Sequence, residues 1–459
     1  MSAPVITATT EDGDDRAGLA ELIDRLREQV GQRLAAETRR LEEVDGVPLS
    51  PQDQQVLVQR LVREALDAHA TACLHAGVEL LLPQQESEVA RAVRDAVTGF
   101  GALEPLMRDG DGHPKGQPED IAYVNGLTFC KWEGDTDWTQ VQTIARSDAE
   151  AIDIVRRIAT SGMEERRFDR SSPVLSCELP DGSRLHATQS VSDGVTLTIR
   201  INRFPDVTLD DLVAFGMLDT GLREFFTSAI RSSRNIVITA ETGGGKTTML
   251  RALCSLLPPT ERLITLEDTR ELGLHRIGRH PNTVSMQARD ANLEGQGRMT
   301  VADLFPSALR MRPDRVIVGE VRGQEIITML NAMNNGNDGS LSTIHASSTS
   351  QAFEKMATYA LQAQERLPVE VTARLVASAV HLVVHLGRDV SGKRVVSSVR
   401  EVTGCDGMQV ASNEIFAPDE NGRAVPASPM SHALASRLEA HGFDRYLLQR
   451  PQGWWEATP

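Results

Sequence analysis

The stretch AETGGGKTTML, Ala240–Leu250, decides the fold of this chain. An apolar run, NIVIT (235–239), comes directly before it, and a helix-forming run, TTMLRALCSLL (247–257), follows its glycines. Strand, glycine-rich loop and helix in this order are the context of a phosphate-binding P-loop. Glycines let successive backbone N–H groups face phosphate oxygens without a Cβ in the way, and the helix N-terminus adds its positive dipole end. The stretch therefore predicts a nucleotide site.

Two side chains of this loop indicate that the ligand is ATP with Mg²⁺. Lys246, one of only five lysines in the chain, would reach the β- and γ-phosphates, and the Thr247 hydroxyl would hold Mg²⁺. Ala240 stands where such loops usually carry their first glycine, a substitution that a strand end tolerates if its backbone is not left-handed. The residues expected to bind the nucleotide are Thr242, Gly243, Gly244, Gly245, Lys246, Thr247 and Thr248. The simpler interpretation, a glycine-rich turn with a surface lysine, does not explain the acids that end other strands.

Composition is that of a soluble globular protein. The 459 residues are enough for two or three domains, and 40% hydrophobic and 24% charged residues are ordinary values. No apolar run approaches the roughly 20 residues that cross a bilayer. Residues 1–18 show no basic start followed by an apolar stretch, so no secretory signal is visible. We expect a cytoplasmic protein.

Charge and cysteine usage disfavour several classes of function. The net charge of −16 repels nucleic acid and anionic membranes, which disfavours, without excluding, a DNA motor with a broad contact surface. The five cysteines are far apart and form no C-x-x-C pair. That spacing suits neither a zinc site nor a disulfide framework, so we expect reduced, mostly buried thiols.

Changes in sequence texture divide the chain into four segments. In the first segment, apolar residues recur at helical spacing. The second segment contains many turn formers and short strand-like runs, and Ser147 within it is a candidate helix N-cap. The last is rich in Pro, Gly and Ser and is expected to be a peripheral tail. The predicted segments are an N-terminal helical region (1–98), a smaller α/β domain (99–207), the P-loop domain (208–415) and a C-terminal tail (416–459).

Four apolar runs in the third segment predict a parallel sheet. They are RNIVITA (234–240), RLITLED (262–268), DRVIVGE (314–320) and SLSTIHA (340–346). Helical stretches separate the runs, and each ends in polar or small residues. This alternation is typical of an α/β sheet that binds its ligand at the C-terminal ends of the strands.

Acids and one histidine end three of these runs. Glu267 and Asp268 end the second and Glu320 the third, where a carboxylate can hold Mg²⁺ through water or orient the attacking water. One such acid alone is usually a solvated loop residue, but several beside a P-loop favour a catalytic site. His345 is either a structural hydrogen-bonding residue or a contact to the γ-phosphate or a neighbouring subunit. A strand that ends in Gly319–Glu320, not in Asp, favours RecA-like motors over kinases and GTPases.

The four motifs together resemble the secretion ATPases of type II and type IV systems, and most closely the CpaF-type ATPases that assemble Flp/Tad pili. The resemblance covers roughly residues 99–415. AETGGGKTT matches the family's Walker A, LITLEDTREL its Asp box, LRMRPDRVIVGEVRG its Walker B region and GNDGSLSTIHA its His box. The implied fold is α/β: a RecA-like P-loop NTPase domain with a smaller α/β N-terminal domain, preceded here by the helical region.

The resemblance also implies how the protein works. Family members form homo-hexameric rings, hydrolyse ATP with Mg²⁺, and act on inner-membrane platform proteins from the cytoplasmic side, with no direct nucleic-acid contact expected. By position, Glu267 would be the catalytic carboxylate, and Glu320 would act on Mg²⁺ and its waters. The arginines that are candidates for phosphate contact are Arg184, Arg200, Arg203, Arg310 and Arg312, each also open to interpretation as a surface charge.

Two departures from the family pattern keep other functions open. Ala240 replaces the first P-loop glycine, and Asn337 stands where the His box often has its first histidine, so hydrolysis could be slower or differently coupled. Segment 109–120, DGDGHPKGQPED, also exceeds the family's usual turn. The alternatives are a RecA-like nucleic-acid translocation motor and a nucleotide-binding scaffold with weak hydrolysis. A small-molecule kinase fits least, because no lid or acceptor pocket is visible.

Overall fold

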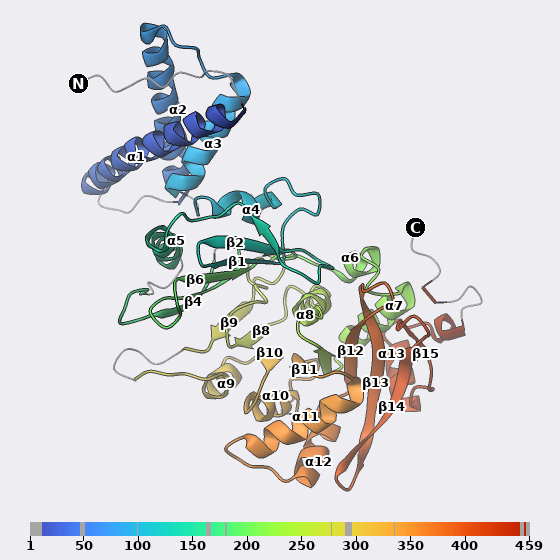
Figure 1. Cartoon of the computed structure of the whole chain (residues 1–459). Helices are drawn as coiled ribbons and strands as arrows, with labels where there is room; N and C mark the ends of the chain where they lie inside the picture. Colours follow the sequence, from blue (N-terminus) through green and yellow to red (C-terminus); the bar gives the residue numbers. More distant parts are fainter. Residues whose placement is uncertain are drawn as a thin grey trace. The chain divides into compact units, whose positions relative to one another are not determined.

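The computed structural model describes residues 12–45, 51–98, 100–161, 167–179, 181–276, 278–289, 296–334, 336–449 and 454–455. The chain forms two compact units, Met1–Ile201 and Asn202–Pro459, each with its own sheet (Figure 1). Within the described ranges, no helix is long and apolar enough to span a membrane.

Three helices open the first unit: α1 (Asp12–Asp45), α2 (Pro51–Ala76) and α3 (Pro83–Thr98). Apolar side chains at helical spacing place a stripe on each helix, and these stripes share one buried cluster that includes Val30 and Leu61, both 0% exposed. The helices predicted in the first segment are confirmed over the residues that the structure describes.

The rest of the first unit is a six-stranded antiparallel sheet in the order β3-β2-β1-β6-β5-β4. Its core also takes in helices α4 and α5. As predicted, α5 begins after Ser147, whose hydroxyl accepts the N–H of Glu150 at 3.3 Å. The elements are α4 (Leu103–Asp109), β1 (Asp120–Val124), β2 (Leu127–Lys131), β3 (Thr139–Val141), α5 (Asp148–Ser161), β4 (Val174–Glu178), β5 (Arg184–Thr188) and β6 (Thr196–Arg200).

Segment 109–120 folds back onto this sheet. The indole N–H of Trp132 donates to the carbonyl oxygen of Gly116 at 2.7 Å, and the His113 ring stacks on the same indole with centroids 3.9 Å apart. A Cβ on Gly110 would collide with the Gly116 carbonyl, so the turn requires glycine there. These contacts give the long turn a structural role.

The second unit is built on a nine-stranded sheet in the order β15-β14-β13-β12-β7-β11-β10-β8-β9. Strands from β12 through to β9 pair in parallel, whereas β12 to β15 pair antiparallel. The four predicted strands, β7, β8, β10 and β11, are confirmed. The strands are β7 (Ile236–Ala240), β8 (Leu263–Glu267), β9 (Thr283–Gln287), β10 (Arg315–Val321), β11 (Leu341–His345), β12 (Leu382–Arg388), β13 (Arg394–Asp406), β14 (Gln409–Pro418) and β15 (Ala424–Pro426).

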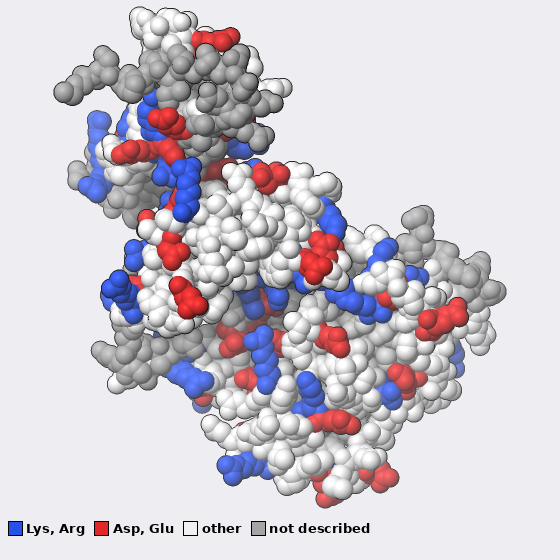
Figure 2. All heavy atoms as spheres, viewed as in Figure 1, with Lys and Arg blue, Asp and Glu red and all other residues white. Residues whose placement is uncertain are grey.

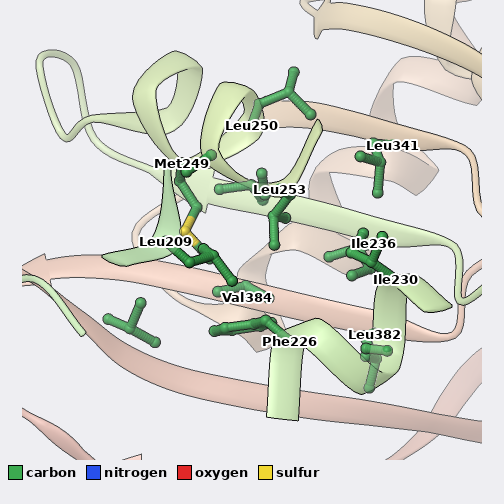
Figure 3. Packing of buried hydrophobic residues seen from close by; sticks show 14 of the residues in the cluster. Leu209, Phe226, Ile230, Ile236, Met249, Leu250, Leu253, Leu341, Leu382 and Val384 are labelled. Atoms are coloured by element: carbon green, nitrogen blue, oxygen red, sulfur yellow. The ribbon is translucent and has the colours of Figure 1, made fainter. Parts of the chain in front are cut away.

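Helices cover both faces of this sheet. Side chains alternate along β7, so Ile236 and Ile238 belong to one apolar cluster and Val237 to the other. Figure 3 shows the first cluster, where Met249 and Leu253 pack beside the strands. Its helices are α6 (Leu209–Ala214), α7 (Thr220–Arg231), α8 (Lys246–Cys254) and α13 (His432–Glu439); those of the second cluster are α9 (Val301–Arg310), α10 (Glu325–Asn334), α11 (Thr349–Gln362) and α12 (Val369–Ala379).

The helix after the P-loop ends earlier than its sequence suggests. The sequence predicts that it runs to Leu257, before two prolines, but α8 ends at Cys254. The hydroxyl of Ser255 donates to the carbonyl of Ala252 at 2.8 Å, and such side-chain contacts compete with the helical backbone ladder. Leu257 still packs into the core, 3% exposed.

The segment after residue 415 was expected to be a peripheral tail, and the structure corrects this. Strand β15 extends the sheet, and Leu438 and Phe443 are buried in the same cluster as α8. The backbone N–H of Trp455 donates to the Asp219 carboxylate at 2.9 Å, and its indole N–H donates to the carbonyl of Ala424 at 2.8 Å. The many turn formers in this segment suggest an irregular tail. Its short elements are stabilised by packing against residues far away in sequence, which local composition does not show.

All five cysteines are free thiols, as expected. Cys73, Cys130 and Cys254 are buried, Cys177 is half-buried and Cys405 is exposed. Burial raises the pKa of both the Cys130 and the Cys254 thiols to about 12, which makes these two poor nucleophiles.

Candidate nucleotide site

The P-loop connects buried strand β7 to helix α8 at the C-terminal edge of the parallel strands. Gly243 and Gly245 have φ values of 71° and 89°, a left-handed backbone that favours glycine. Lys246 is the first residue of α8 and only 8% exposed. The loop thus has the backbone shape and the buried cation that phosphate binding requires.

Gly244 is required for a different reason, which involves Ala240. A Cβ at Gly244 would lie 2.5 Å from the Cβ of Ala240 and 3.0 Å from the carbonyl oxygen of Glu241. Ala240 itself is fully buried and extended as the last residue of β7. The alanine therefore fits at the position of the usual first glycine, because its backbone is not left-handed.

Sheet register brings His345 and Glu320 to the loop. His345, the last residue of β11, pairs with Ala240 on β7. Strand β10 has a bulge between Val318 and Val321, which contains Glu320; bulges re-aim side chains at such edges. The hydroxyl of Thr343 donates to the carbonyl of Gly319 at 2.8 Å and fastens the bulge.

Lys246, His345, Glu320 and Arg322 form one cluster. The Lys246 Nζ atom lies 3.1 Å from His345 Nδ1 and 3.5 Å from Glu320 Oε1. His345 Nε2 lies 2.9 Å from the same Oε1, and Arg322 Nε donates to Glu320 Oε2 at 2.6 Å. Three of the residues predicted from sequence therefore meet at the P-loop, together with an arginine that was not predicted.

Burial and charge set the protonation of this cluster. Burial lowers the pKa of Lys246, and burial followed by the charge of Lys246 lowers the pKa of His345. Burial alone would raise the pKa of Glu320, but Arg322 and Lys246 outweigh it and hold that pKa below its usual range. The cluster thus contains a carboxylate and a neutral imidazole near neutral pH.

The carboxylate of Glu267 is buried in the fold and is not exposed at the P-loop. It is 3% exposed, and its Oε1 atom accepts the backbone N–H groups of Glu271 at 2.8 Å and Leu272 at 3.0 Å. The Cβ of any side chain at Gly319 would lie 2.9 Å from its Cγ. Glu267 is packed between two strand ends and holds the backbone of the loop that follows β8.

Glu271 is a site residue that sequence reasoning missed. The Thr247 hydroxyl donates to its Oε2 atom at 2.7 Å, so it is the carboxylate of the Asp-box stretch that reaches the P-loop. The available signal was its membership of LITLEDTREL, where only the two acids at the strand end were singled out for chemistry.

Arg394 is a second missed residue. It begins β13, and its Nε–H donates to the carbonyl oxygen of Gly243 at 2.7 Å. Its Cδ atom would lie 3.6 Å from a Cβ at Gly245. Arg394 therefore packs on the P-loop backbone, although it lies 151 residues after Gly243 in the chain. No local sequence motif marks it as a site residue.

Of the arginines proposed from sequence, three remain predictions as phosphate contacts. Arg184 and Arg200 pair with each other on β5 and β6 of the first unit, and Arg200 Nε donates to Asp120 Oδ1 at 2.9 Å. Arg203 belongs to the second unit, where its guanidinium carbon lies 5.0 Å from the centroid of the Phe204 ring.

Arg310, Arg312 and Asn337 lie at the other edge of the sheet. The first two precede β10 and are exposed, and Asn337 precedes β11. In a parallel sheet the residues before a strand lie opposite those that follow it. Within this chain these three side chains therefore lie at the edge away from the P-loop.

The oxygen donors at the loop fit Mg²⁺. A hard cation of this kind is usually held by one or two protein oxygens together with phosphates and waters, and the Thr247 hydroxyl and the Glu271 carboxylate are such donors. Among the described residues, no group of three or more His, Cys, Asp or Glu side chains could hold a metal by itself.

Comparison with known proteins places the chain in a family. A model of the Type II/IV secretion system protein family matches residues 140–422, more than half of the chain. The chain belongs to this family. Its membership confirms the coarser resemblance seen in the motifs and supports an ATP-hydrolysing enzyme.

Individual curated relatives align with half or more of the chain. A Mycobacterium tuberculosis protein, provisionally named for conjugal transfer, is 31% identical over 359 residues, which are 76% of this chain and 97% of that protein. Type IV secretion system protein VirB11 of Brucella suis is 33% identical over 256 residues, 50% of this chain and 70% of its own. The crystal structure of the Brucella suis VirB11 ATPase with sulphate has 29% identity and a TM-score of 0.35, covering 65% of this chain and 95% of its own.

Proposed function

We propose that this protein is an ATPase motor of a type II/IV-like secretion or pilus machine, of the CpaF-type branch that serves Flp/Tad pili. The observation that carries the proposal is the buried lysine of a well-formed P-loop, Lys246, held between His345 and Glu320 at the strand ends. Membership of the secretion family and the order of the four motifs support the choice of machine.

The roles we propose follow the geometry of the second unit. Backbone N–H groups of Gly243–Gly245 and the Lys246 ammonium bind the β- and γ-phosphates. The Thr247 hydroxyl would hold Mg²⁺, and the Glu320 carboxylate would act on Mg²⁺ and its waters. When bound, Mg²⁺ would neutralise charge that develops on the transferred phosphoryl group. Glu320, whose side chain is 21% exposed, is better placed than buried Glu267 to orient the attacking water.

Assembly and location are further parts of the proposal. We propose a homo-hexamer that docks on inner-membrane platform proteins at the cytoplasmic face. Arg184 would reach the phosphates when the N-terminal domain closes, and Arg203 would reach them from the start of the second unit. A planar guanidinium suits phosphate oxygens, and its arrival on closure would couple hydrolysis to motion. Type II/IV family membership and the P-loop domain are consistent with such a ring motor.

The test is Mg²⁺-dependent release of phosphate from ATP by the full chain, with and without Lys246→Ala. Lys355→Ala on α11 is the matched control, because it removes one of the few other lysines outside the site. We expect turnover that rises as the protein oligomerises, loss of turnover in the first variant and retention in the second. A mass measurement with a non-hydrolysable ATP analogue should give a hexamer. Full activity of Lys246→Ala would remove the P-loop from the mechanism.

A nucleic-acid motor is the second candidate, because several relatives carry names that refer to conjugal transfer. Among the residues coloured on the face drawn in Figure 2, acidic and basic side chains are interspersed, and the net charge of the chain is −16. DNA-stimulated turnover with a steep salt dependence would favour this candidate. Turnover that DNA leaves unchanged favours the secretion motor.

A further inference from the structure

The loop after β8 is fastened at two places. From the sheet side, Glu267 Oε1 accepts the backbone N–H groups of Glu271 and Leu272. From the helix side, Arg251 of α8 donates through Nη2 to the carbonyl of Glu271 and through Nε, at 3.3 Å, to the carbonyl of Leu272. Both anchoring side chains are buried, Glu267 at 3% and Arg251 at 8% exposure. The backbone of this loop is therefore held rigidly between the sheet and the helix.

Rigid fastening fixes where the Glu271 side chain ends. Its Oε2 atom accepts the proton of the Thr247 hydroxyl at 2.7 Å. A hydroxyl has one proton and two lone pairs, so donation to Glu271 leaves the oxygen of Thr247 able to accept a cation. Threonine at this point of a P-loop is the residue that contacts Mg²⁺. Glu271 thus places a negative carboxylate directly beside the expected metal position.

Glu320 differs from Glu271 in this respect. Both of its oxygens are engaged by cationic or imidazole groups, Oε1 by His345 and Oε2 by Arg322. Its charge is largely balanced within the cluster of four residues, as the lowering of its pKa by Arg322 and Lys246 also indicates. The carboxylate in contact with the P-loop hydroxyl is that of Glu271.

We propose that Glu271 is an acid of the magnesium site and that Glu267 is the positioning residue that holds it there. The proposal rests on the proposed function, since it assigns residues of the same nucleotide site. It replaces the expectation that Glu267 is the catalytic carboxylate. Glu267 acts through the backbone N–H groups it accepts, and Glu271 supplies the charge that favours a divalent cation next to Thr247.

Affinity for ADP, with MgCl₂ and with EDTA, tests the acid without relying on turnover. The full-length chain is titrated with a fluorescent ADP analogue in both conditions, and the ratio of the two affinities is the readout. Glu271→Gln keeps an acceptor for the Thr247 hydroxyl but removes the charge. We expect this ratio to fall by about 10-fold or more, with the affinity in EDTA unchanged. Glu354→Gln, which removes an exposed charge from α11 outside the site, is the matched control and should keep the wild-type ratio.

A pair of variants tests the positioning role of Glu267. Glu267→Gln retains an oxygen that can accept both N–H groups, and it should keep most of the magnesium effect. Glu267→Ala leaves these N–H groups without an acceptor, so the loop shifts and the magnesium effect should fall as in Glu271→Gln. Hydrogen exchange at residues 271 and 272 should then speed up in the alanine variant alone.

The outcomes separate this inference from the proposed function. Wild-type protein that binds no ADP in either condition would overturn the nucleotide site itself. Wild-type protein that shows a clear magnesium effect, retained in full by Glu271→Gln, would overturn only the assignment of Glu271. Equal loss in Glu267→Gln and Glu267→Ala would overturn the positioning role, because it would show that the charge of Glu267 acts directly.

Discussion

The Nζ atom of Lys246 lies 3.1 Å from the Nδ1 atom of His345, across the ends of two adjacent parallel strands. The same Nζ atom lies 3.2 Å from Nε2, so the ammonium group sits beside both ring nitrogens. A neutral imidazole offers one of these nitrogens as an acceptor, while the other can donate its proton to Glu320. The lowered pKa of His345, caused by burial and then by Lys246, agrees with a neutral ring. The P-loop lysine is therefore held in place by the sheet before any phosphate reaches it.

Removing the imidazole should loosen this lysine. In His345→Ala we expect kcat for ATP hydrolysis to fall by roughly 10- to 100-fold, because small misplacements of a catalytic cation are costly. His345→Gln, which can both donate and accept, should lose less. Steady-state ATPase kinetics of the three proteins provide the measurement. Unchanged kcat in the alanine variant would show that His345 has no positioning role.

The close approach of Ala240 to Gly244 predicts that a substitution at one position can be compensated by a substitution at the other. Gly244→Ala should abolish nucleotide binding, since the new Cβ would lie 2.5 Å from that of Ala240. Ala240→Gly alone should cost about 0.5–1 kcal/mol of stability without raising turnover, because the alanine already fits.

The double variant Ala240→Gly/Gly244→Ala removes this clash, although the carbonyl of Glu241 remains 3.0 Å from the new Cβ. We expect it to recover part of the ADP affinity that Gly244→Ala loses. Fluorescence titration and thermal unfolding of all four proteins check both quantities. A double variant as defective as Gly244→Ala would show that the clash with Ala240 is not the cause.

Much of the site could be predicted because parallel strands end at a common edge. Lys246, Glu320 and His345 each follow an apolar run, so their approach follows from topology alone. Glu271 could not be found in this way, since it lies beyond the end of its strand. Its position depends on the two N–H groups that Glu267 accepts and on the contact with Arg251.

Two expectations from the sequence rest on patterns that do not show where a residue lies in the fold. Arg310 and Arg312 are candidates for phosphate contact because they are near β10 in sequence, but within this chain they precede the strand and so lie at its other end. The segment after residue 415 was expected to be peripheral because its short elements have weak local patterns. Its buried residues, such as Leu438, are held by contacts with distant helices and strands.

The contact from Arg394 to the P-loop carbonyl predicts a role in shaping the loop. Arg394→Ala should weaken ADP binding by about 10-fold, the effect of losing one charge-assisted hydrogen bond of roughly 1.5 kcal/mol. Arg394→Lys should lose nearly as much, since lysine lacks the planar fork. Arg388→Ala, at the end of β12, is the control for loss of a neighbouring arginine. Calorimetric titration with ADP is the measurement, and wild-type affinity in Arg394→Ala would contradict the role.

His381 predicts how stability depends on pH. Its Nδ1 atom accepts the backbone N–H of Asn235 at 2.9 Å, and burial, followed by the charge of Arg234, lowers its pKa from 6.5 to about 4. Between pH 6.5 and 4 the unfolded chain therefore binds this proton and the folded chain does not. Stability must fall as the pH drops through this window and be unaffected by this group above it. The full loss of unfolding free energy is roughly 3 kcal/mol, because protonation of one group changes it by about 1.4 kcal/mol per pH unit across the window.

Replacing this histidine isolates its contribution from those of the other buried histidines. His381→Asn keeps an oxygen that can accept the N–H of Asn235 but has no proton to gain, so its free energy of unfolding should fall less steeply between pH 6.5 and 4. His432→Asn, at an exposed position at the start of α13, should follow the wild-type slope. Urea unfolding at a series of pH values measures all three proteins. Both variants lose one histidine from the unfolded chain, so a difference between their slopes reports the folded environment of His381. Identical slopes would mean that the His381 ring is protonated as readily in the folded protein as in the unfolded one.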